Sequence, residues 1–296
     1  MTRQRAGHSN NADRSAAADD SVLRQGMAAL ERRSDEAERI ARDLLSRRPQ
    51  HAGALLLLGL SLLAQHRARD AVAPLEQAAR DSADPMVETH YAASLRHVGR
   101  TAEAIEWLER ATSRQPPFAI AFRELGVLLC SMRRYEEAEA VLKRGLEAAP
   151  TVAEISVELG GVYICRADPA NAKVAFARAL AHAPGHVRAL HGFGTALLFE
   201  GEFDRAAERF RQVLARNPYH VRARLDLAHC LLEQRQPDQA MATLRGLVRA
   251  APQHYGKALK LLASSGRGRF WLRPSVAAVV LQRGDRADSV NRPTLS

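Results

Sequence analysis

Histidine is the residue type whose spacing in this sequence first suggests chemistry. His51, His186, His220 and His254 each lie two residues after a proline, and a neutral imidazole is a common metal ligand. The ligands of one zinc ion lie within about 2.1 Å of it, whereas equivalent positions in stacked helical layers are separated by about 8 to 10 Å per layer. We therefore predict no metal site and place these histidines at helix starts, where backbone N–H groups lack partners.

Residue strings that mark common catalytic and nucleotide sites are absent. The sequence contains no H-E-x-x-H, G-x-S-x-G or G-x-x-x-x-G-K-[ST] string, and Gly192–Gly194 is only a short part of a glycine loop. Cys130, Cys165 and Cys230 lack the spacing of a zinc ribbon or a disulfide framework. We accordingly predict a non-enzymatic protein with no cofactor, no metal and no small-molecule substrate.

Prolines divide the chain into units of constant length, and these units must position any functional residue. The last five of six prolines are each separated by 34 residues; the six are Pro49, Pro116, Pro150, Pro184, Pro218 and Pro252. Self-similarity at this period is typical of a solenoid, in which stacked units present an extended binding surface. A proline also ends the helix before it.

Between the prolines, apolar and small residues follow the period of a helix. Phe122, Leu125, Gly126 and Leu129 form one stripe, and a second stripe begins at Ala138. We therefore predict two antiparallel helices in each unit. Small residues recur at the eighth position (Gly126, Gly160, Gly194, Ala228) and at the twentieth (Ala104, Ala138, Ala172, Ala206, Ala240), where they let the two helices approach closely.

These small residues, together with a proline at position 32 of the unit, resemble the tetratricopeptide repeat (TPR) family. The resemblance implies an all-α fold, a right-handed superhelical solenoid of antiparallel helix pairs with a C-terminal capping helix. In the family's register, residues 18–254 form seven repeats: 18–51, 52–84, 85–118, 119–152, 153–186, 187–220 and 221–254. We expect residues 1–17 to be a disordered polar leader and residues 255–265 to be the capping helix.

Residues 266–296 combine arginine, glycine and aromatic residues with a polar tail. We favour a hydrophobic latch, in which Phe270, Trp271 and residues 276–281 cover the end of the solenoid. A partner-docking motif and a single-strand nucleic-acid contact are the alternatives.

The net charge of +10 raises the question of an anionic partner. A basic chain is one mark of nucleic-acid binders, but the excess comes from 39 arginines and only four lysines, mostly beside glutamates on exposed helix faces. Nucleic acid is therefore the less favoured partner. No apolar run is long enough to span a membrane, and we expect a cytoplasmic protein.

The resemblance also implies that first helices of the repeats line a binding groove. The positions that face this groove in the family hold six basic candidates for peptide binding: Arg96, Arg123, Arg188, His191, Arg222 and His229. The asparagine and lysine of the family's two-carboxylate clamp are absent from these positions. An arginine and histidine cluster at the C-terminal end suits an acidic or carboxylate-ended peptide, although the same arginines are equally suited to pair with neighbouring glutamates.

We therefore predict a protein–protein interaction scaffold or adaptor, which binds an extended peptide or a partner helix in its groove. Two alternatives stay open: a nucleic-acid-binding protein, and an accessory subunit of a separately encoded enzyme.

Overall fold

Helices and the turns between them make up the part of the chain that the structure describes. The computed structural model describes residues 18–80, 82–263, 279 and 281, and no strand occurs among them. The chain divides into two compact units, Met1–Pro150 and Thr151–Ser296. The all-α fold of paired helices predicted from the sequence is confirmed.

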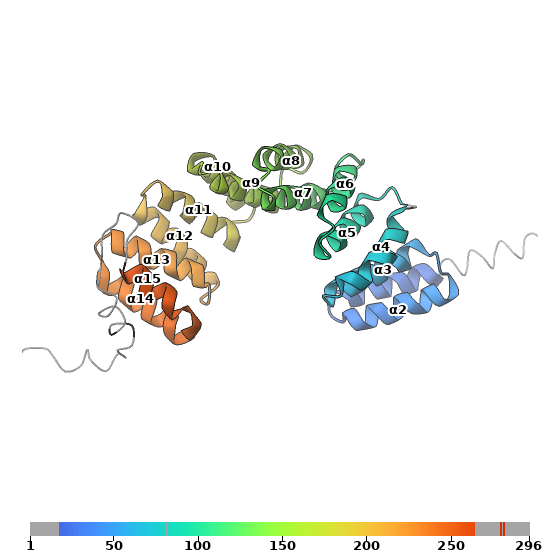
Figure 1. Cartoon of the computed structure of the whole chain (residues 1–296), viewed down its shortest axis with the longest axis horizontal. Coiled ribbons are helices and arrows are strands. Elements are labelled where there is room, and N and C mark those ends of the chain that lie inside the picture. Colours follow the sequence, from blue (N-terminus) through green and yellow to red (C-terminus); the bar gives the residue numbers. More distant parts are fainter. Residues whose placement is uncertain (1–17, 81, 264–278, 280, 282–296) are drawn as a thin grey trace, which may run out of the picture. The chain divides into compact units, whose positions relative to one another are not determined.

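In the first unit, each helix packs against the helix that follows it (Figure 1). Residues 18–30 are helical and precede α2. The further helices are α2 (Ser34–Arg47), α3 (Ala52–Ala64), α4 (Ala68–Arg80), α5 (Pro85–His97), α6 (Thr101–Thr112), α7 (Ala119–Ser131) and α8 (Tyr135–Ala148).

The second unit repeats this arrangement. Its helices are α9 (Ala153–Cys165), α10 (Pro169–His182), α11 (Val187–Phe199), α12 (Phe203–Arg216), α13 (Val221–Glu233), α14 (Pro237–Ala250), the 3-10 helix Pro252–His254 and α15 (Tyr255–Ala263). The first helices of successive repeats also contact each other, α9 with α11, α11 with α13, and α13 with α15. These first helices therefore form one continuous row within the unit.

Close approach within a helix pair requires the small residues of the repeat. A methyl group added to Gly160 would lie 2.6 Å from the ring of Phe176 in the partner helix, and one added to Gly194 would lie 2.7 Å from the ring of Phe210. The alanines at the twentieth position, among them Ala172, are fully buried. The prediction that small residues let the two helices pack closely is confirmed.

The turn from first to second helix has the same form in six repeats. In the fifth, the N–H of Asp168 donates to the carbonyl of Tyr163, and the N–H of Ala167 donates to that of Ile164, which is a Schellman motif. The motif places one residue in the left-handed region, with φ between 55° and 85°: His66, Gly99, Arg133, Ala167, Gly201 and Arg235. Glycine fills this position in two of the six turns, at Gly99 and Gly201.

Histidine side chains cap three of the first helices. The Nδ1 atoms of His51, His186 and His220 accept hydrogen bonds from the N–H groups of Ala54, Ala189 and Ala223, at 3.1 to 3.2 Å. These bonds satisfy backbone donors that a helix start leaves free. The predicted role is confirmed for these three, whereas His254 lies in the 3-10 helix Pro252–His254.

A buried carboxylate, that of Glu88, lies in the first helix of the third repeat. Glu88 on α5 is 0% exposed; it accepts a hydrogen bond from Arg114 Nη2 at 2.8 Å and forms an ion pair with the Nε of Arg110, also at 2.8 Å. Trp107, beside Arg110, packs edge-on against Tyr91. The two guanidinium groups supply the counter-charge that a buried carboxylate needs.

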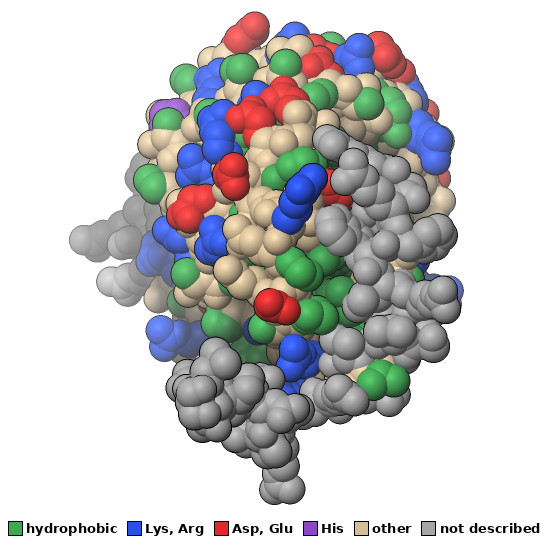
Figure 2. All heavy atoms as spheres, turned by 90° about the vertical axis from the view of Figure 1, so that its left-hand side faces the viewer, with side chains coloured by type: hydrophobic (Ala, Val, Ile, Leu, Met, Phe, Trp, Pro, Cys, Tyr) green, Lys and Arg blue, Asp and Glu red, His purple; other side chains and the backbone are tan. Residues whose placement is uncertain are grey.

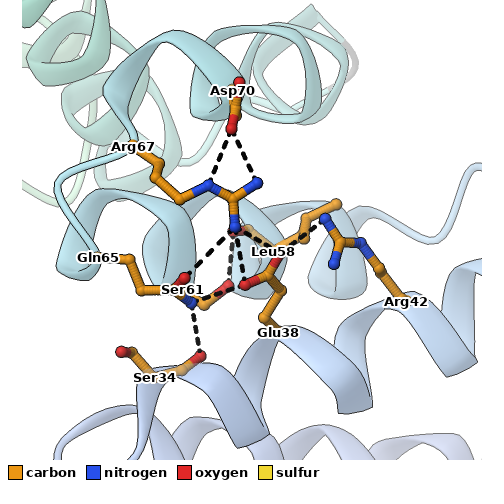
Figure 3. Close-up of polar contacts among 8 residues, drawn as sticks. All are labelled: Ser34, Glu38, Arg42, Leu58, Ser61, Gln65, Arg67 and Asp70. Atoms are coloured by element: carbon orange, nitrogen blue, oxygen red, sulfur yellow. Dashed lines mark hydrogen bonds and ion pairs between the residues drawn. The ribbon is translucent and has the colours of Figure 1, made fainter.

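A second buried carboxylate joins the first two repeats (Figure 3). Glu38 of α2 accepts from Gln65 Nε2 at 2.7 Å and from Arg67 Nη1 at 3.0 Å, and Arg42 pairs with it at 2.6 Å. Burial disfavours ionisation of Glu38, but the hydrogen bonds from Gln65 and Arg67 outweigh it and lower the pKa of this carboxyl. The cluster fixes the α3–α4 turn against α2.

The core of the second unit extends beyond the last repeat. Ala258 and Leu262 of α15 are fully buried in it, and so is Leu281, at 5% exposed. Leu281 belongs to the segment that the sequence suggests as a latch, and Val279 of the same segment is exposed. Phe270, Trp271 and residues 276–278 and 280 lie outside the described residues, as does the expected leader, 1–17.

Candidate functional site

The six basic residues predicted to bind a peptide all lie on first helices of repeats. Arg96 and Arg123 belong to the first unit, on α5 and α7, whereas Arg188, His191, Arg222 and His229 belong to the second, on α11 and α13. They therefore form two groups, and each group is described within its own unit.

In the first unit, Glu124 lies between the two predicted arginines. Its carboxylate pairs with Arg123 Nη2 at 2.6 Å and with Arg96 Nη2 at 3.5 Å, so that α5 and α7 are joined. Burial lowers the pKa of His90, which precedes Arg96 on α5. Both arginines of this group are thus already paired with Glu124.

In the second unit, Arg188 forms a two-point ion pair across successive first helices. Its Nη1 and Nη2 atoms donate to the two carboxylate oxygens of Glu158 on α9, at 2.8 and 3.1 Å. This geometry is the strongest form of an arginine–carboxylate contact, and the hydrogen bond raises the pKa of Arg188.

Asp226 is the centre of the next contact along the row. It accepts from His191 Nε2 of α11 at 3.0 Å and from Arg222 Nε of its own helix at 3.1 Å. The ring of His220 lies 5.1 Å from that of His191, and burial, together with this second imidazole, lowers the pKa of His220. Two of the side chains that meet here, His191 of α11 and Arg222 of α13, were predicted as site residues from their positions in the repeat.

A pocket adjoins this group between α13 and α15. It has a volume of about 290 Å³ and is lined by Arg222, Leu225, Asp226, His229, Lys257, Lys260 and Leu261. His229 Nε2 also lies 3.7 Å from Glu233. We call this cavity the α13–α15 pocket, and two of the predicted site residues, Arg222 and His229, line it.

Lys257, Lys260 and Leu261 are the lining residues that lie outside the seven predicted repeats, on the helix that the sequence identifies only as a cap. The repeat pattern identifies α15 only as a cap, because its Ala258 and Leu262 continue the buried stripe. One signal was present: Lys257 and Lys260 are two of only four lysines in a chain with 39 arginines, and they lie one helical turn apart. Such a pair on an exposed helix face is a candidate anion contact.

Cys230 is the buried member of the three cysteines, whereas Cys165 is exposed and Cys130 is half-buried. Burial raises the pKa of the Cys230 thiol to about 12, so that this cysteine is not a thiolate near neutral pH. In the described ranges no cluster of three or more histidine, cysteine or acidic residues is arranged to hold a metal ion. None of the helices there is both long and apolar enough to cross a bilayer.

Comparison with known families agrees with the repeats seen in both units. A sequence profile described as tetratricopeptide repeat matches residues 95–156 and 197–264, and another of the same description matches residues 23–85. The chain belongs to the tetratricopeptide repeat family. This is a family of protein–protein interaction modules, whose members bind protein partners. A comparison with curated proteins returns no match.

Solved structures with the same fold include proteins of several kinds. The chain is similar to a chain of the APC/C hetero-tetramer Cut9–Hcn1, with a TM-score of 0.65 and 19% identity, over 82% of this chain and 47% of that one. PilW, described as a widely conserved type IV pilus biogenesis factor, has a TM-score of 0.63 and 18% identity, over 71% and 98%. The C-terminal part of a TPR repeat-containing protein from Cytophaga hutchinsonii has 0.60 and 15%, over 81% and 99%. At these identities the likeness concerns the fold alone, and the present chain spans about half the length of the Cut9–Hcn1 chain.

Proposed function

We propose that this chain is a non-catalytic scaffold that binds an extended, acidic segment of a partner protein along the first helices of its second unit. We call this surface the charged face and define it by Glu158, Arg188, His191, Arg222, Asp226 and His229. An extended segment suits this surface because α9, α11 and α13 follow one another in a row. Each of these helices contributes charged or titratable side chains to it.

The orientation of the ion pairs carries the proposal. Arg188 and Arg222 are 61% and 72% exposed, whereas their partners Glu158 and Asp226 are only 14% and 16% exposed. The carboxylates therefore lie beneath the guanidinium groups, and an approaching partner meets positive charge first. Arg222 uses only its Nε for Asp226, which leaves its terminal amino groups to bind a carboxylate from outside.

A nucleic-acid partner fits these observations less well. On the side of the molecule drawn in Figure 2, basic and acidic side chains are interspersed among the described atoms and form no continuous basic patch. Phosphate recognition along a strand requires several adjacent cations with few anions between them. On the charged face, each arginine lies next to a carboxylate.

Selection from a random peptide library displayed on phage tests the proposal. We expect the purified full chain to enrich peptides rich in Asp and Glu, and Arg188→Glu/Arg222→Glu to lose this enrichment. The matched control is Arg205→Glu/Arg211→Glu, which makes the same charge change on exposed positions of α12, a second helix. Enrichment without an acidic bias, or equal loss in both variants, would contradict the proposal, as would preferential binding to single-stranded nucleic acid.

A further inference from the structure

We infer that α15 is part of the binding surface as well as a cap, and that with α13 it forms an anchor pocket for one aliphatic side chain next to an acidic side chain of the partner segment. This inference rests on the proposed function, because it names the chemistry that the C-terminal end of the charged face recognises. Three properties of the α13–α15 pocket carry it.

The first property is an apolar floor. Leu225 of α13 and Leu261 of α15 line the pocket, and both are half-buried against the core of the second unit. Because the core holds these side chains in place, the apolar surface they present to the pocket is preformed. An aliphatic side chain that covers this surface is removed from water, and little conformational entropy of the pocket side chains is lost.

The second property is an excess of positive charge. Two permanent cations with no other ion pair in the described ranges, Arg222 apart from its Nε contact and Lys257, line the pocket with one carboxylate, that of Asp226. Asp226 already accepts hydrogen bonds from both Arg222 and His191. Lys257 is exposed, and it forms no ion pair within the described ranges. A carboxylate from outside is therefore the complementary group.

The third property is size. A volume of about 290 Å³ is at the lower limit of pockets that hold drug-sized molecules. It accommodates one or two side chains and excludes a packed helix or a domain. The pocket thus suits an anchor residue of an extended segment.

Two segments are candidates to occupy the α13–α15 pocket, a segment of a partner protein and the chain's own C-terminal segment, and their charges differ. Residues 264–296 contain six arginines and two aspartates, so this segment has the same sign as the pocket. An acidic segment of another protein is complementary, and we assign the pocket to it.

Short amidated peptides of Asp, Glu and Ser that carry one central Leu provide the probe, with fluorescence anisotropy as the readout. We expect Lys257→Gln/Lys260→Gln to weaken binding of the Leu-containing acidic peptide about five- to tenfold, since positive charge beside the pocket is removed. Replacing Leu by Ser in the peptide is expected to weaken binding about tenfold. The matched control is Lys143→Gln/Lys173→Gln, the chain's other two lysines, which lie on α8 and α10 and do not line the pocket.

The peptide series separates the inference from the proposed function. If the acids beside Leu are changed to amides, the effect of Lys257→Gln/Lys260→Gln should disappear. Unchanged binding to the lysine variant, with binding still lost in Arg188→Glu/Arg222→Glu, would overturn the anchor pocket and leave the proposed function intact. Loss in neither variant would overturn both. If binding required a free C-terminal carboxylate on the peptide, the side-chain anchor described above would also be overturned. Thermal unfolding checks that each protein variant is folded.

Discussion

Single residues of this chain have structural roles that depend on the groups they contact. His51, His186 and His220 are helix caps, and their role followed from the sequence because the proline sets where each first helix begins. The ion pairs of Arg188 and His191 did not follow, because they join residues 30 and 35 positions apart on different helices. Their partners depend on side-chain conformations that a repeat pattern does not contain.

The buried Glu88 provides a test at the residue scale. Changing Arg110 and Arg114 together to Ala leaves this carboxylate without counter-charge at 0% exposure, and we expect a loss of about 3 kcal/mol in the free energy of unfolding. Adding Glu88→Gln should recover part of the loss, because the neutral amide is easier to bury. Urea unfolding measures both, and an additive result for the triple variant would contradict this account.

His220 makes stability depend on pH. Its pKa in the folded chain is lowered from the usual 6.5, so the unfolded chain binds more protons below that value. The contribution of this residue is present above about pH 6.5 and is lost as pH falls through the lowered folded pKa. His220→Asn keeps a capping side chain that does not titrate.

We therefore expect wild type to lose more stability than His220→Asn as pH is lowered from about 7.5 to 5. His191 and Asp226, the groups facing His220, are present in both proteins, so the difference between the two curves reports His220. Parallel curves for the two proteins would show that protonation of His220 is not coupled to unfolding.

Among the elements, the helix pair and its turn were the most predictable parts. The stripe that begins at Phe122 and the small residues at Gly160 and Gly194 specify two closely packed helices. The need for a left-handed residue at each turn was visible only where glycine occurs, at Gly99 and Gly201. At Ala167 an ordinary residue adopts the same conformation because the Schellman hydrogen bonds around it are formed.

The turns offer a paired prediction. Ala167→Gly should raise the free energy of unfolding by about 0.5 to 1 kcal/mol, because glycine adopts positive φ without the strain that alanine has. Gly201→Ala should lower it by a similar amount, since Gly201 has φ of 78°. Thermal or urea unfolding measures the free energy of unfolding of both variants. Changes of the same sign in the two variants would contradict the left-handed conformation assigned to these turn residues.

At the scale of the whole molecule, two units of stacked helix pairs present first helices in continuous rows. The period of the prolines predicted this architecture, because each repeat buries its apolar stripe only against its neighbours. The role of α15 in the pocket was missed, since its buried stripe alone identifies a cap while its lysines lie on the opposite, exposed side. The α13–α15 pocket forms only where α15 packs on α13, so the sequence pattern of a single repeat does not predict it.

The central claim is that exposed guanidinium groups of the charged face hold an acidic segment of a partner. The most direct measurement is the affinity of an acidic peptide, recovered by selection, for wild type, for Arg188→Glu/Arg222→Glu and for Arg205→Glu/Arg211→Glu at the same ionic strength. We expect the first variant to bind at least about tenfold more weakly, a loss of about 1.4 kcal/mol, and the second to bind like wild type. Equal affinity of all three proteins, or an equal loss in both variants, would contradict the claim.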